Sequence, residues 1–170
     1  MNNIYLTGFM GTGKSSTGRE IAGRLKWAYC DLDELIEQQE KKSIPDIFKE
    51  KGEPYFRGLE NKFLQEISHR NNQVVSCGGG IVINPENIKL MKETGVMVCF
   101  SAKPEVILAR TRKFSHRPLL NVPNPEEKIS SLLAERQKFY SQADIVVDTS
   151  ELSIVQAAKL VLNSISKHFK

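Results

Sequence analysis

Short apolar runs alternate with longer amphipathic segments along most of the chain. The apolar runs are rich in β-branched and aromatic residues and nearly continuous in apolar character, which predicts strands covered on both faces within a parallel sheet. They are the runs 3–7, 27–31, 73–77, 96–100 and 144–148. Apolar residues at helical spacing predict helices at 14–25, 33–41, 45–51, 53–70, 85–94, 103–112, 125–142 and 152–167. We therefore expect a serial βα organisation.

This order predicts an α/β fold with three layers, because parallel strands need crossover connections and right-handed crossovers place helices over the sheet. The chain of 170 residues is long enough for one domain and short for two, so 1–170 is interpreted as a single domain. The last predicted helix has one apolar face, which we expect in the core: Ile154, Ala157, Ala158, Val161, Leu162 and Ile165.

A phosphate-binding motif follows the first predicted strand. In GFMGTGKSS, the GxxxxGK[ST] pattern is filled by Gly8, Gly13, Lys14 and Ser15, with a predicted strand before it and a helix after it. Glycines let backbone N–H groups curl around phosphate oxygens, the helix N-terminus adds its dipole, Lys14 adds a point charge, and the Ser15 hydroxyl can hold Mg²⁺. The motif predicts nucleoside triphosphate binding but not the acceptor, because GTPases, motor ATPases and small-molecule kinases share it.

Two carboxylates at the end of the second predicted strand narrow the choice. CDLDELIE places Asp31 and Asp33 two residues apart, and on an extended strand end both would project toward the carboxyl edge, where α/β proteins bind ligands. One could orient Mg²⁺ and its waters while the other accepts a hydrogen bond from an attacking hydroxyl. Alternatively, one of them caps the helix that follows. Neither NKxD nor a glutamine-bearing DxxG occurs, which disfavours a GTPase.

The charge balance favours a small anionic ligand over nucleic acid. Lysine and arginine number 24 against 20 acidic residues, a net +4 spread along the chain. No apolar run approaches the roughly 18 residues that span a bilayer, and the N-terminus does not resemble a signal peptide. Cys30, Cys77 and Cys99 lack metal-binding spacing and are expected to be buried free thiols. We expect a cytoplasmic protein that binds neither membrane nor nucleic acid.

Two segments fit the regular βα plan poorly. Residues 33–62 insert helices and charges between the second and third predicted strands, and residues 112–125 form an irregular connection with prolines and basic side chains. Long irregular connections are often functional. We interpret 32–62 as an inserted substrate-binding segment and 112–125 as a substrate-covering lid, with an ordinary solvated loop as the alternative for the latter.

These features together resemble the shikimate kinases, a branch of the P-loop small-molecule kinases related in fold to nucleoside monophosphate kinases. The similarity covers nearly the whole chain and rests on motifs in a fixed order: GFMGTGKSS, DLDELIE, SIPDIF, GEPYFRGLE, SCGGGIV, HRPLL and ERQKFY. It implies a P-loop NTPase fold with a five-stranded parallel sheet in the order 2-3-1-4-5. It also implies transfer of the γ-phosphate of ATP to the 3-hydroxyl of shikimate, in the pathway to chorismate and aromatic amino acids, by a monomer with one Mg²⁺.

The resemblance assigns roles to individual residues. Asp31 and Ser15 would hold Mg²⁺, and Asp33 would hydrogen-bond the hydroxyl that attacks the γ-phosphate. Arg57 and Arg136 would grip the carboxylate of shikimate, because a planar guanidinium pairs with a carboxylate in a bidentate way and a lysine does not. The ATP-binding residues that it implies are Gly11, Thr12, Gly13, Lys14, Ser15, Ser16, Arg110 and Arg117.

The catalytic residues that the resemblance implies are Lys14, Asp33 and Arg117. Charge spreads over the phosphoryl oxygens in the transition state, so cations supplied by Lys14, Mg²⁺ and Arg117 would contribute more there than in the ground state. Arg117 belongs to the predicted lid. Arg110 would pack against adenine.

The run of glycines in SCGGGIV, residues Gly78, Gly79 and Gly80, indicates a close approach to the backbone. By resemblance it would close against the substrate ring, where a Cβ would intrude on the ring or forbid the required φ and ψ. Ser76 just before it would support the Mg²⁺ shell or act as a capping hydroxyl. The alternatives that stay open are a gluconate kinase, which shares the P-loop and general fold, and a nonenzymatic ATP-binding regulatory protein.

Overall fold

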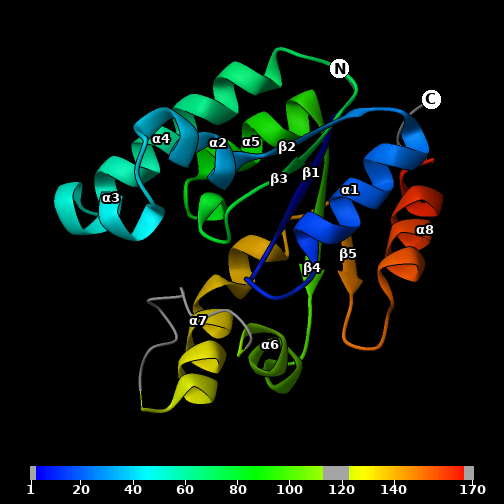
Figure 1. Cartoon of the computed structure of the whole chain (residues 1–170). Coiled ribbons are helices and arrows are strands. Elements are labelled where there is room, and N and C mark those ends of the chain that lie inside the picture. Colours follow the sequence, from blue (N-terminus) through cyan, green and yellow to red (C-terminus); the bar gives the residue numbers. More distant parts are fainter. Residues whose placement is uncertain (1–2, 113–122, 167–170) are drawn as a thin grey trace.

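The computed structural model of the protein describes residues 3–112 and 123–166. Its centre is a five-stranded parallel sheet in the order β2-β3-β1-β4-β5 (Figure 1), which confirms the predicted α/β fold and strand order. The strands are β1 (Asn3–Gly8), β2 (Ala28–Asp31), β3 (Gln73–Ser76), β4 (Gly95–Ser101) and β5 (Ile145–Asp148). Each strand begins and ends within one residue of its predicted range.

The helices agree with their predicted ranges to within two residues at either end. They are α1 (Lys14–Leu25), α2 (Leu32–Glu40), α3 (Ile44–Lys51), α4 (Glu53–Ser68), α5 (Pro85–Thr94), α6 (Pro104–Thr111), α7 (Pro125–Tyr140) and α8 (Ile154–Ile165). A short 3-10 helix, η1 (Ile81–Ile83), was not predicted. Side-chain caps explain several helix starts, because Ser43, Asn84 and Ser153 each accept a backbone N–H of the helix that follows.

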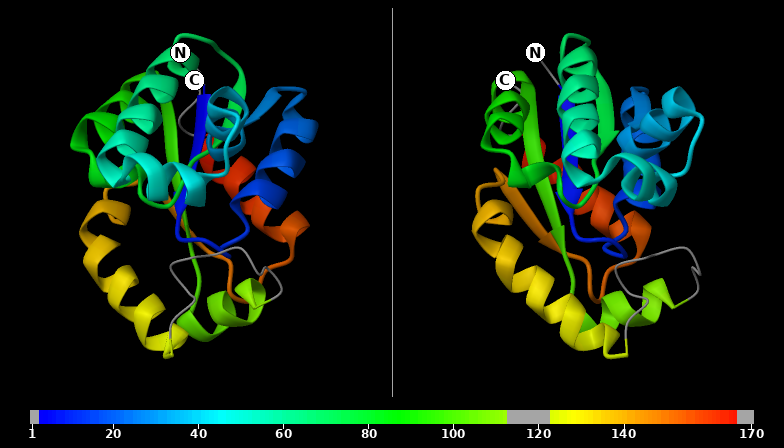
Figure 2. Two further views of the ribbon diagram at one scale, coloured as in Figure 1. Left: turned by 60° about the vertical axis from the view of Figure 1, so that its left-hand side comes forward. Right: turned by 90° about the vertical axis from the view of Figure 1, so that its left-hand side faces the viewer.

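Two helical layers cover the sheet (Figure 2). Successive side chains of a strand point to opposite faces of the sheet, so each layer buries a different set of residues. On one face, Ile4, Leu6 and Val98 pack in a cluster with Ala158 and Val161 of α8 and with residues of α1. The opposite face contributes Tyr5, Val75 and Met97 to a second cluster, with residues of α4 and α5. The three-layer prediction is therefore confirmed.

The edge strands depart from the prediction that all strands are covered on both faces. β2 is partly exposed along its length, and Val146 of β5 is 57% exposed, because an edge strand has a neighbour on one side only and α8 packs against the Val147 face. Ile154 in the first turn of α8 is 47% exposed, so the prediction that its whole apolar face is buried is wrong there. Cys30 on β2 is partly exposed for the same reason, whereas Cys77 and Cys99 are buried; all of them are free thiols.

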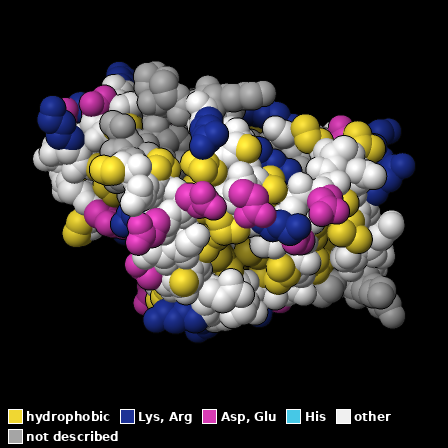
Figure 3. Space-filling view, turned by 90° about the horizontal axis from the view of Figure 1, so that it is seen from below, with side chains coloured by type: hydrophobic (Ala, Val, Ile, Leu, Met, Phe, Trp, Pro, Cys, Tyr) yellow, Lys and Arg dark blue, Asp and Glu magenta, His cyan; other side chains and the backbone are white. Residues whose placement is uncertain are grey.

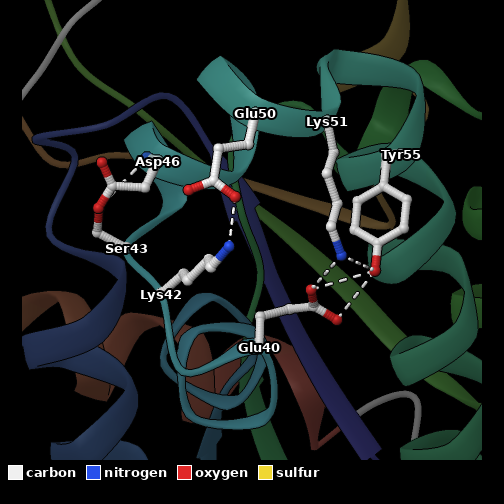
Figure 4. Close-up of polar contacts among 7 residues, drawn as sticks. All are labelled: Glu40, Lys42, Ser43, Asp46, Glu50, Lys51 and Tyr55. Carbon is white, nitrogen blue, oxygen red and sulfur yellow. Dashed lines mark hydrogen bonds and ion pairs between the residues drawn. The ribbon is translucent and has the colours of Figure 1, made fainter.

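The helices α2, α3 and α4 form the segment inserted between β2 and β3, and polar contacts tie them together (Figure 4). Lys51 at the end of α3 pairs with Glu40 at the end of α2 at 3.2 Å, and Tyr55 of α4 hydrogen-bonds the same carboxylate at 3.1 Å. Lys42 pairs with Glu50 as a further link between the α2–α3 turn and α3. These contacts are largely exposed and contribute little to stability, whereas Ile36, Ile47 and Phe56 of the three helices share a buried cluster.

All strands point their carboxyl ends toward the side that carries α6, α7 and the β1–α1 loop, the lower side in Figure 1. Figure 3 looks onto that side and shows acidic and basic side chains beside exposed hydrophobic ones. Phe9, which follows β1, packs there with Ile107 of α6 and Ile129 of α7. None of the helices in the described ranges has the length and hydropathy needed to cross a bilayer.

One close backbone contact at the centre of the sheet yields a stability prediction. Gly95 pairs with Asn3 of β1, and a Cβ on Gly95 would lie 2.1 Å from the Asn3 carbonyl oxygen. Gly95→Ala is expected to lower the free energy of unfolding by about 2–3 kcal/mol, because backbone cannot rotate away as a side chain can. Urea-induced unfolding measures this change.

The matched control is Gly23→Ala in α1, where nothing lies within 4 Å of an added Cβ. This substitution is expected to raise stability by about 0.5 kcal/mol, since alanine favours helix over glycine. Equal effects of the two substitutions would contradict the predicted collision at Gly95.

Candidate active site

The loop between β1 and α1 has the backbone of an anion-binding loop. Gly8, Gly11 and Gly13 have φ values of +124°, +75° and +92°, in the region that other residues rarely adopt. Gly13 is the N-cap of α1 and brings no side chain to bond the first N–H groups of the helix. Backbone N–H groups at the start of α1 can therefore bind phosphate oxygens.

Lys14 and Thr12 hydrogen-bond carbonyl oxygens of the loop itself, whereas Ser15 and Ser16 are exposed. Lys14 folds back over the loop, where its Nζ donates to the carbonyl oxygens of Gly8 and Phe9, both at 2.9 Å. Thr12 is fully buried and its hydroxyl donates to the Phe9 carbonyl at 2.7 Å, so a contact between Thr12 and ATP falls to its backbone. Ser15 and Ser16 are exposed at the start of α1.

Asp31 and Asp33 do not lie on one extended strand end, so that prediction is wrong. β2 ends at Asp31 and α2 begins at Leu32, which puts Asp33 in the first helical turn. Asp31 Oδ1 accepts the backbone N–H of Asp33 at 3.2 Å and that of Glu34 at 3.4 Å. Asp31 is thus the helix cap of the alternative interpretation, because a carboxylate at this position satisfies N–H groups that the helix itself cannot.

Oxygen-bearing side chains meet beside the phosphate-binding loop. Ser15 Oγ donates to Asp31 Oδ2 at 3.0 Å and lies 3.4 Å from Ser76 Oγ. The register of β2 and β3 pairs Asp31 with Ser76, which brings these two residues together. One carboxylate and two hydroxyls suit Mg²⁺, which keeps several waters and uses substrate phosphates to complete its shell. Within residues 3–112 and 123–166, no group of three or more acidic, histidine or cysteine side chains could form an all-protein metal cage.

The glycine run makes room for charged side chains, and its backbone is unstrained. Gly80 has a φ of −98°, and the positive-φ glycines of the described chain are Gly8, Gly11, Gly13 and Gly52, so the expected need for a special φ and ψ at the run is wrong. A Cβ on Gly80 would lie 2.4 Å from the guanidinium nitrogens of Arg57. On Gly78 it would lie 2.7 Å from Glu60 Oε1 and 2.8 Å from Asp33 Oδ1.

We call the group formed by Asp33, Arg57, Glu60, Arg136 and the run Gly78–Gly80 the acceptor corner. Within it, Asp33 Oδ1 and Glu60 Oε1 are the buried side-chain atoms of the described residues that have no hydrogen-bond partner. Burial, followed by the charge of Asp31, raises the pKa of Asp33 to about 6 from its ordinary 3.8. Burial also raises the pKa of Glu60 to about 7, although Arg57 opposes this shift.

Two arginines flank these carboxylates. Arg57 of α4 bonds Glu53 at 2.8 Å and Glu60 at 2.6 Å, which holds its guanidinium against the glycine run. Arg136 of α7 lies on the other side, where its Nη1 would be 3.4 Å from a Cβ on Gly79. The structure therefore brings the predicted residues Asp33, Arg57 and Arg136 together at Gly78–Gly80.

Arg110 lies at a separate place, between the phosphate-binding loop and the loop that follows β5. Its guanidinium donates to the Gly11 carbonyl at 3.3 Å and to the Thr149 carbonyl at 2.7 Å. The Thr149 hydroxyl in turn donates to the Thr12 carbonyl at 2.8 Å. Arg110 thus borders the phosphate-binding loop on the side away from the acceptor corner. Arg117 and residues 113–122 of the predicted lid lie outside the described residues.

Glu60 of the acceptor corner and Tyr140 beside it were not predicted from the sequence. Glu60 is 1% exposed, and Tyr140 of α7 donates its hydroxyl to the Gly79 carbonyl at 2.8 Å. A signal for Glu60 was present, because the helical spacing of Phe56, Phe63 and Leu64 places this acid on the apolar face of α4. An acid on an apolar face is unusual unless it has a partner or a function. Tyr140 carried no comparable signal, since a tyrosine at the end of an amphipathic helix commonly belongs to the core.

The fold and the site together define a P-loop kinase, with a phosphate-binding loop after the central strand and a polar corner at the same sheet edge. The family model described as shikimate kinase matches residues 10–166. The shikimate kinase of Thermoanaerobacter pseudethanolicus is 43% identical over 164 residues, which cover 96% of each chain. That of Geobacter metallireducens is 46% identical over 154 residues, which cover 91% of this chain and 86% of the relative. The chain belongs to the shikimate kinase family.

Solved structures agree with this assignment. A shikimate kinase from Acinetobacter baumannii, in complex with shikimate, has a TM-score of 0.92 and 35% identity, and the match covers 100% of this chain and 96% of that one. A gluconokinase from Sinorhizobium meliloti has a TM-score of 0.59 at 15% identity, covering 98% and 93% of the two chains, and shares the fold alone. Both results favour the shikimate kinase interpretation over its alternatives.

The buried Asp33 carboxyl generates a prediction about pH and stability. Its folded pKa of about 6 exceeds the ordinary 3.8, so ionisation is harder in the folded state and stability falls as pH rises between these values. Asp33→Asn removes this cost. Without ligand, the free energy of unfolding of Asp33→Asn is expected to exceed that of the parent protein by about 1–3 kcal/mol at pH 8. The two proteins should not differ near pH 4. Chemical denaturation over this pH range measures both.

Asp148→Asn is the control of opposite sign. Two hydrogen bonds from Ser150, from its hydroxyl and its backbone N–H, lower the pKa of Asp148, so its carboxylate stabilises the fold above the ordinary pKa and loses that effect in acid. This variant should be less stable than the parent protein at pH 8. A stability gain for Asp33→Asn that is the same at pH 4 and pH 8 would contradict a raised pKa.

Proposed function

We propose that the protein transfers the γ-phosphate of ATP to the 3-hydroxyl of shikimate, giving shikimate 3-phosphate and ADP, one step toward chorismate and the aromatic amino acids. The observation that carries this proposal is the convergence of Asp33, Glu60, Arg57 and Arg136 on the glycine run, at the sheet edge that also holds the phosphate-binding loop. Membership in the shikimate kinase family supports it.

The chemistry of the acceptor corner matches that of shikimate, a small ring with one carboxylate and several hydroxyls. The guanidinium groups of Arg57 and Arg136 can pair with the carboxylate and fix the orientation of the ring. When ionised, the unpartnered oxygens of Asp33 and Glu60 accept hydrogen bonds, so hydroxyl groups of the acceptor can satisfy them. Gly78–Gly80 leaves space for the ring to approach the backbone.

In the transfer step, the hydroxyl oxygen of the acceptor forms a bond to the γ-phosphorus while the bond to the β–γ bridging oxygen breaks. Asp33 accepts the hydroxyl proton, and the electron pair of the broken bond goes to ADP. Lys14, which already lies over the phosphate-binding loop, stabilises the charge that spreads over the phosphoryl oxygens. Arg117 would add a second cation from the predicted lid. No covalent enzyme intermediate is involved.

The nucleotide would lie along the P-loop. Its phosphates would contact Gly11, Thr12, Gly13, Ser15 and Ser16. Arg110 would border the adenine side, held by its bonds to Gly11 and Thr149. Ser15 and Asp31 would hold one Mg²⁺, with the Ser76 hydroxyl close to Ser15; the ion would supply Lewis acidity to the phosphoryl group. The same proposal interprets the chain as a single domain, in which 32–62 is the substrate-binding segment and 112–125 is the lid.

A monomer acting in the cytoplasm is the remaining part of this proposal. The three cysteines are free thiols, which a reducing compartment maintains. ATP and the acceptor are small molecules, so neither nucleic acid nor membrane is required for the reaction.

The experiment that tests the proposed function measures ADP release with ATP and Mg²⁺ in the presence of shikimate, gluconate, a nucleoside monophosphate or no acceptor. ³¹P NMR identifies the product. Strong stimulation by shikimate alone, with one new phosphomonoester signal, is the expected result. Stimulation by gluconate or a nucleotide instead would remove the roles given to Arg57 and Arg136, and equal release without any acceptor would contradict kinase activity toward a small molecule.

The proposed grip on the carboxylate predicts the effect of Arg136→Lys. We expect KM for shikimate to rise about tenfold or more, because lysine keeps the charge and loses the bidentate fork, whereas KM for ATP should change less than twofold. Steady-state kinetics with each substrate varied in turn measure both. Arg24→Lys, at an exposed pair with Glu20, is the matched control and should change neither. Equal increases in the two KM values would contradict the assigned role.

A further inference from the structure

Tyr29 of β2 has its hydroxyl in the group of oxygens beside the phosphate-binding loop, although its ring belongs to the packing between β2 and α1. The ring lies against α1 at Gly18, where a Cβ would be 2.8 Å from Tyr29 Cε2. Its hydroxyl donates to Asp31 Oδ2 at 3.1 Å, because residues two apart on a strand project to the same side. The Tyr29 hydroxyl also interacts with the hydroxyls of Ser15 and Ser76.

The hydrogen bonds of the Asp31 carboxylate show what Tyr29 contributes. Oδ1 is occupied by two backbone N–H groups at the start of α2. Oδ2 accepts from two hydroxyls, those of Ser15 and Tyr29. Ser15 is also the proposed direct ligand of Mg²⁺, and its hydroxyl would then serve both the ion, through a lone pair, and Oδ2, through its hydrogen. Tyr29 is the second donor to Oδ2, and its hydrogen bond does not involve a group proposed to touch the ion.

The ring of Tyr29 is anchored by neighbouring side chains while its hydroxyl donates to Asp31. The guanidinium carbon of Arg19 lies 4.4 Å from the ring centroid. Arg19 in turn pairs with Glu34 of α2 at 3.0 Å, although both side chains are more than half exposed. The ring therefore has contacts on α1 and, through Arg19, on α2.

We propose that Tyr29 is a positioning residue of the metal site: its hydroxyl fixes the Asp31 carboxylate in the orientation that receives Mg²⁺ and its waters. This inference rests on the proposed function, which supplies the Mg²⁺ ion at this site. Groups that orient a metal-binding carboxylate typically change metal affinity by about tenfold or more when removed. Tyr29 would act through Asp31, without touching either substrate.

The test substitutes Tyr29→Phe, which keeps the ring on Gly18 and under Arg19 and removes only the hydroxyl. Isothermal titration calorimetry measures the affinity for ADP without Mg²⁺ and with saturating Mg²⁺. The ratio of the two affinities is the Mg²⁺-dependent gain in ADP affinity. We expect the gain to fall about tenfold in the variant, with the Mg²⁺-free affinity unchanged. An unchanged Mg²⁺-free affinity also shows that the phosphate-binding loop is still folded.

Tyr5→Phe is the matched control, because Tyr5 also loses a hydroxyl on the same sheet, where it bonds Thr94 at 2.7 Å in a buried position. It should lower thermal stability and leave the Mg²⁺-dependent gain unchanged. A gain in Tyr29→Phe equal to that of the parent protein would overturn the role of Tyr29. If the parent protein itself showed no Mg²⁺-dependent gain, the metal site of the proposed function would fall instead, and the two failures are thus distinguishable.

Discussion

The site depends on one electrostatic constraint, the burial of two carboxylate oxygens that have no partner within the described protein. Asp33 Oδ1 and Glu60 Oε1 both face Gly78, and each would collide with a side chain placed there. A buried charge without a hydrogen bond is unfavourable, so the carboxyls hold their protons more tightly than they would in water. Donors supplied by a bound acceptor would relieve this cost. An acceptor without hydroxyls would leave these oxygens unpartnered, so the proposed site would disfavour it.

The fold determines where this constraint can be met. Parallel strands bring the ends of β1, β2 and β3 to one edge, so the phosphate-binding loop, Asp31 and the glycine run are neighbours although they lie far apart in the sequence. The inserted helices carry Asp33, Arg57 and Glu60 over that edge. Ile36, Ile47 and Phe56, one from each of α2, α3 and α4, belong to one buried cluster that packs these helices together. Arg136 approaches from α7 on the opposite side. The proposed donor and acceptor sites thus lie on different elements that share one edge.

The sequence predicted most of this arrangement where a residue type has one physical use. Strong periodicity identified every strand and every α-helix of the described chain, and the P-loop glycines have the positive φ that their spacing implies. Prediction failed where a residue type has several uses. Aspartate occurs both at strand ends and at helix starts, and the structure places Asp33 in the first turn of α2 and uses Asp31 Oδ1 as the cap of that helix. Glycine permits both a positive φ and the close approach of other groups. At Gly78–Gly80 the φ values are not positive, and the glycines make room for neighbouring charged side chains. Glu60 was missed because its partners come from other elements, which a local pattern does not reveal.

In the ligand-free protein, burial without hydrogen-bond partners raises the pKa values of Asp33 and Glu60. ¹³C NMR of the side-chain carboxyls tests this most directly. The ligand-free protein is titrated between pH 4 and pH 9, and the signals are assigned by comparison with Asp33→Asn and Glu60→Gln. One carboxyl is expected to titrate near pH 6 and another near pH 7, and each signal should be lost in its own variant. Titration of both near their ordinary pKa values of 3.8 and 4.5 would contradict this expectation.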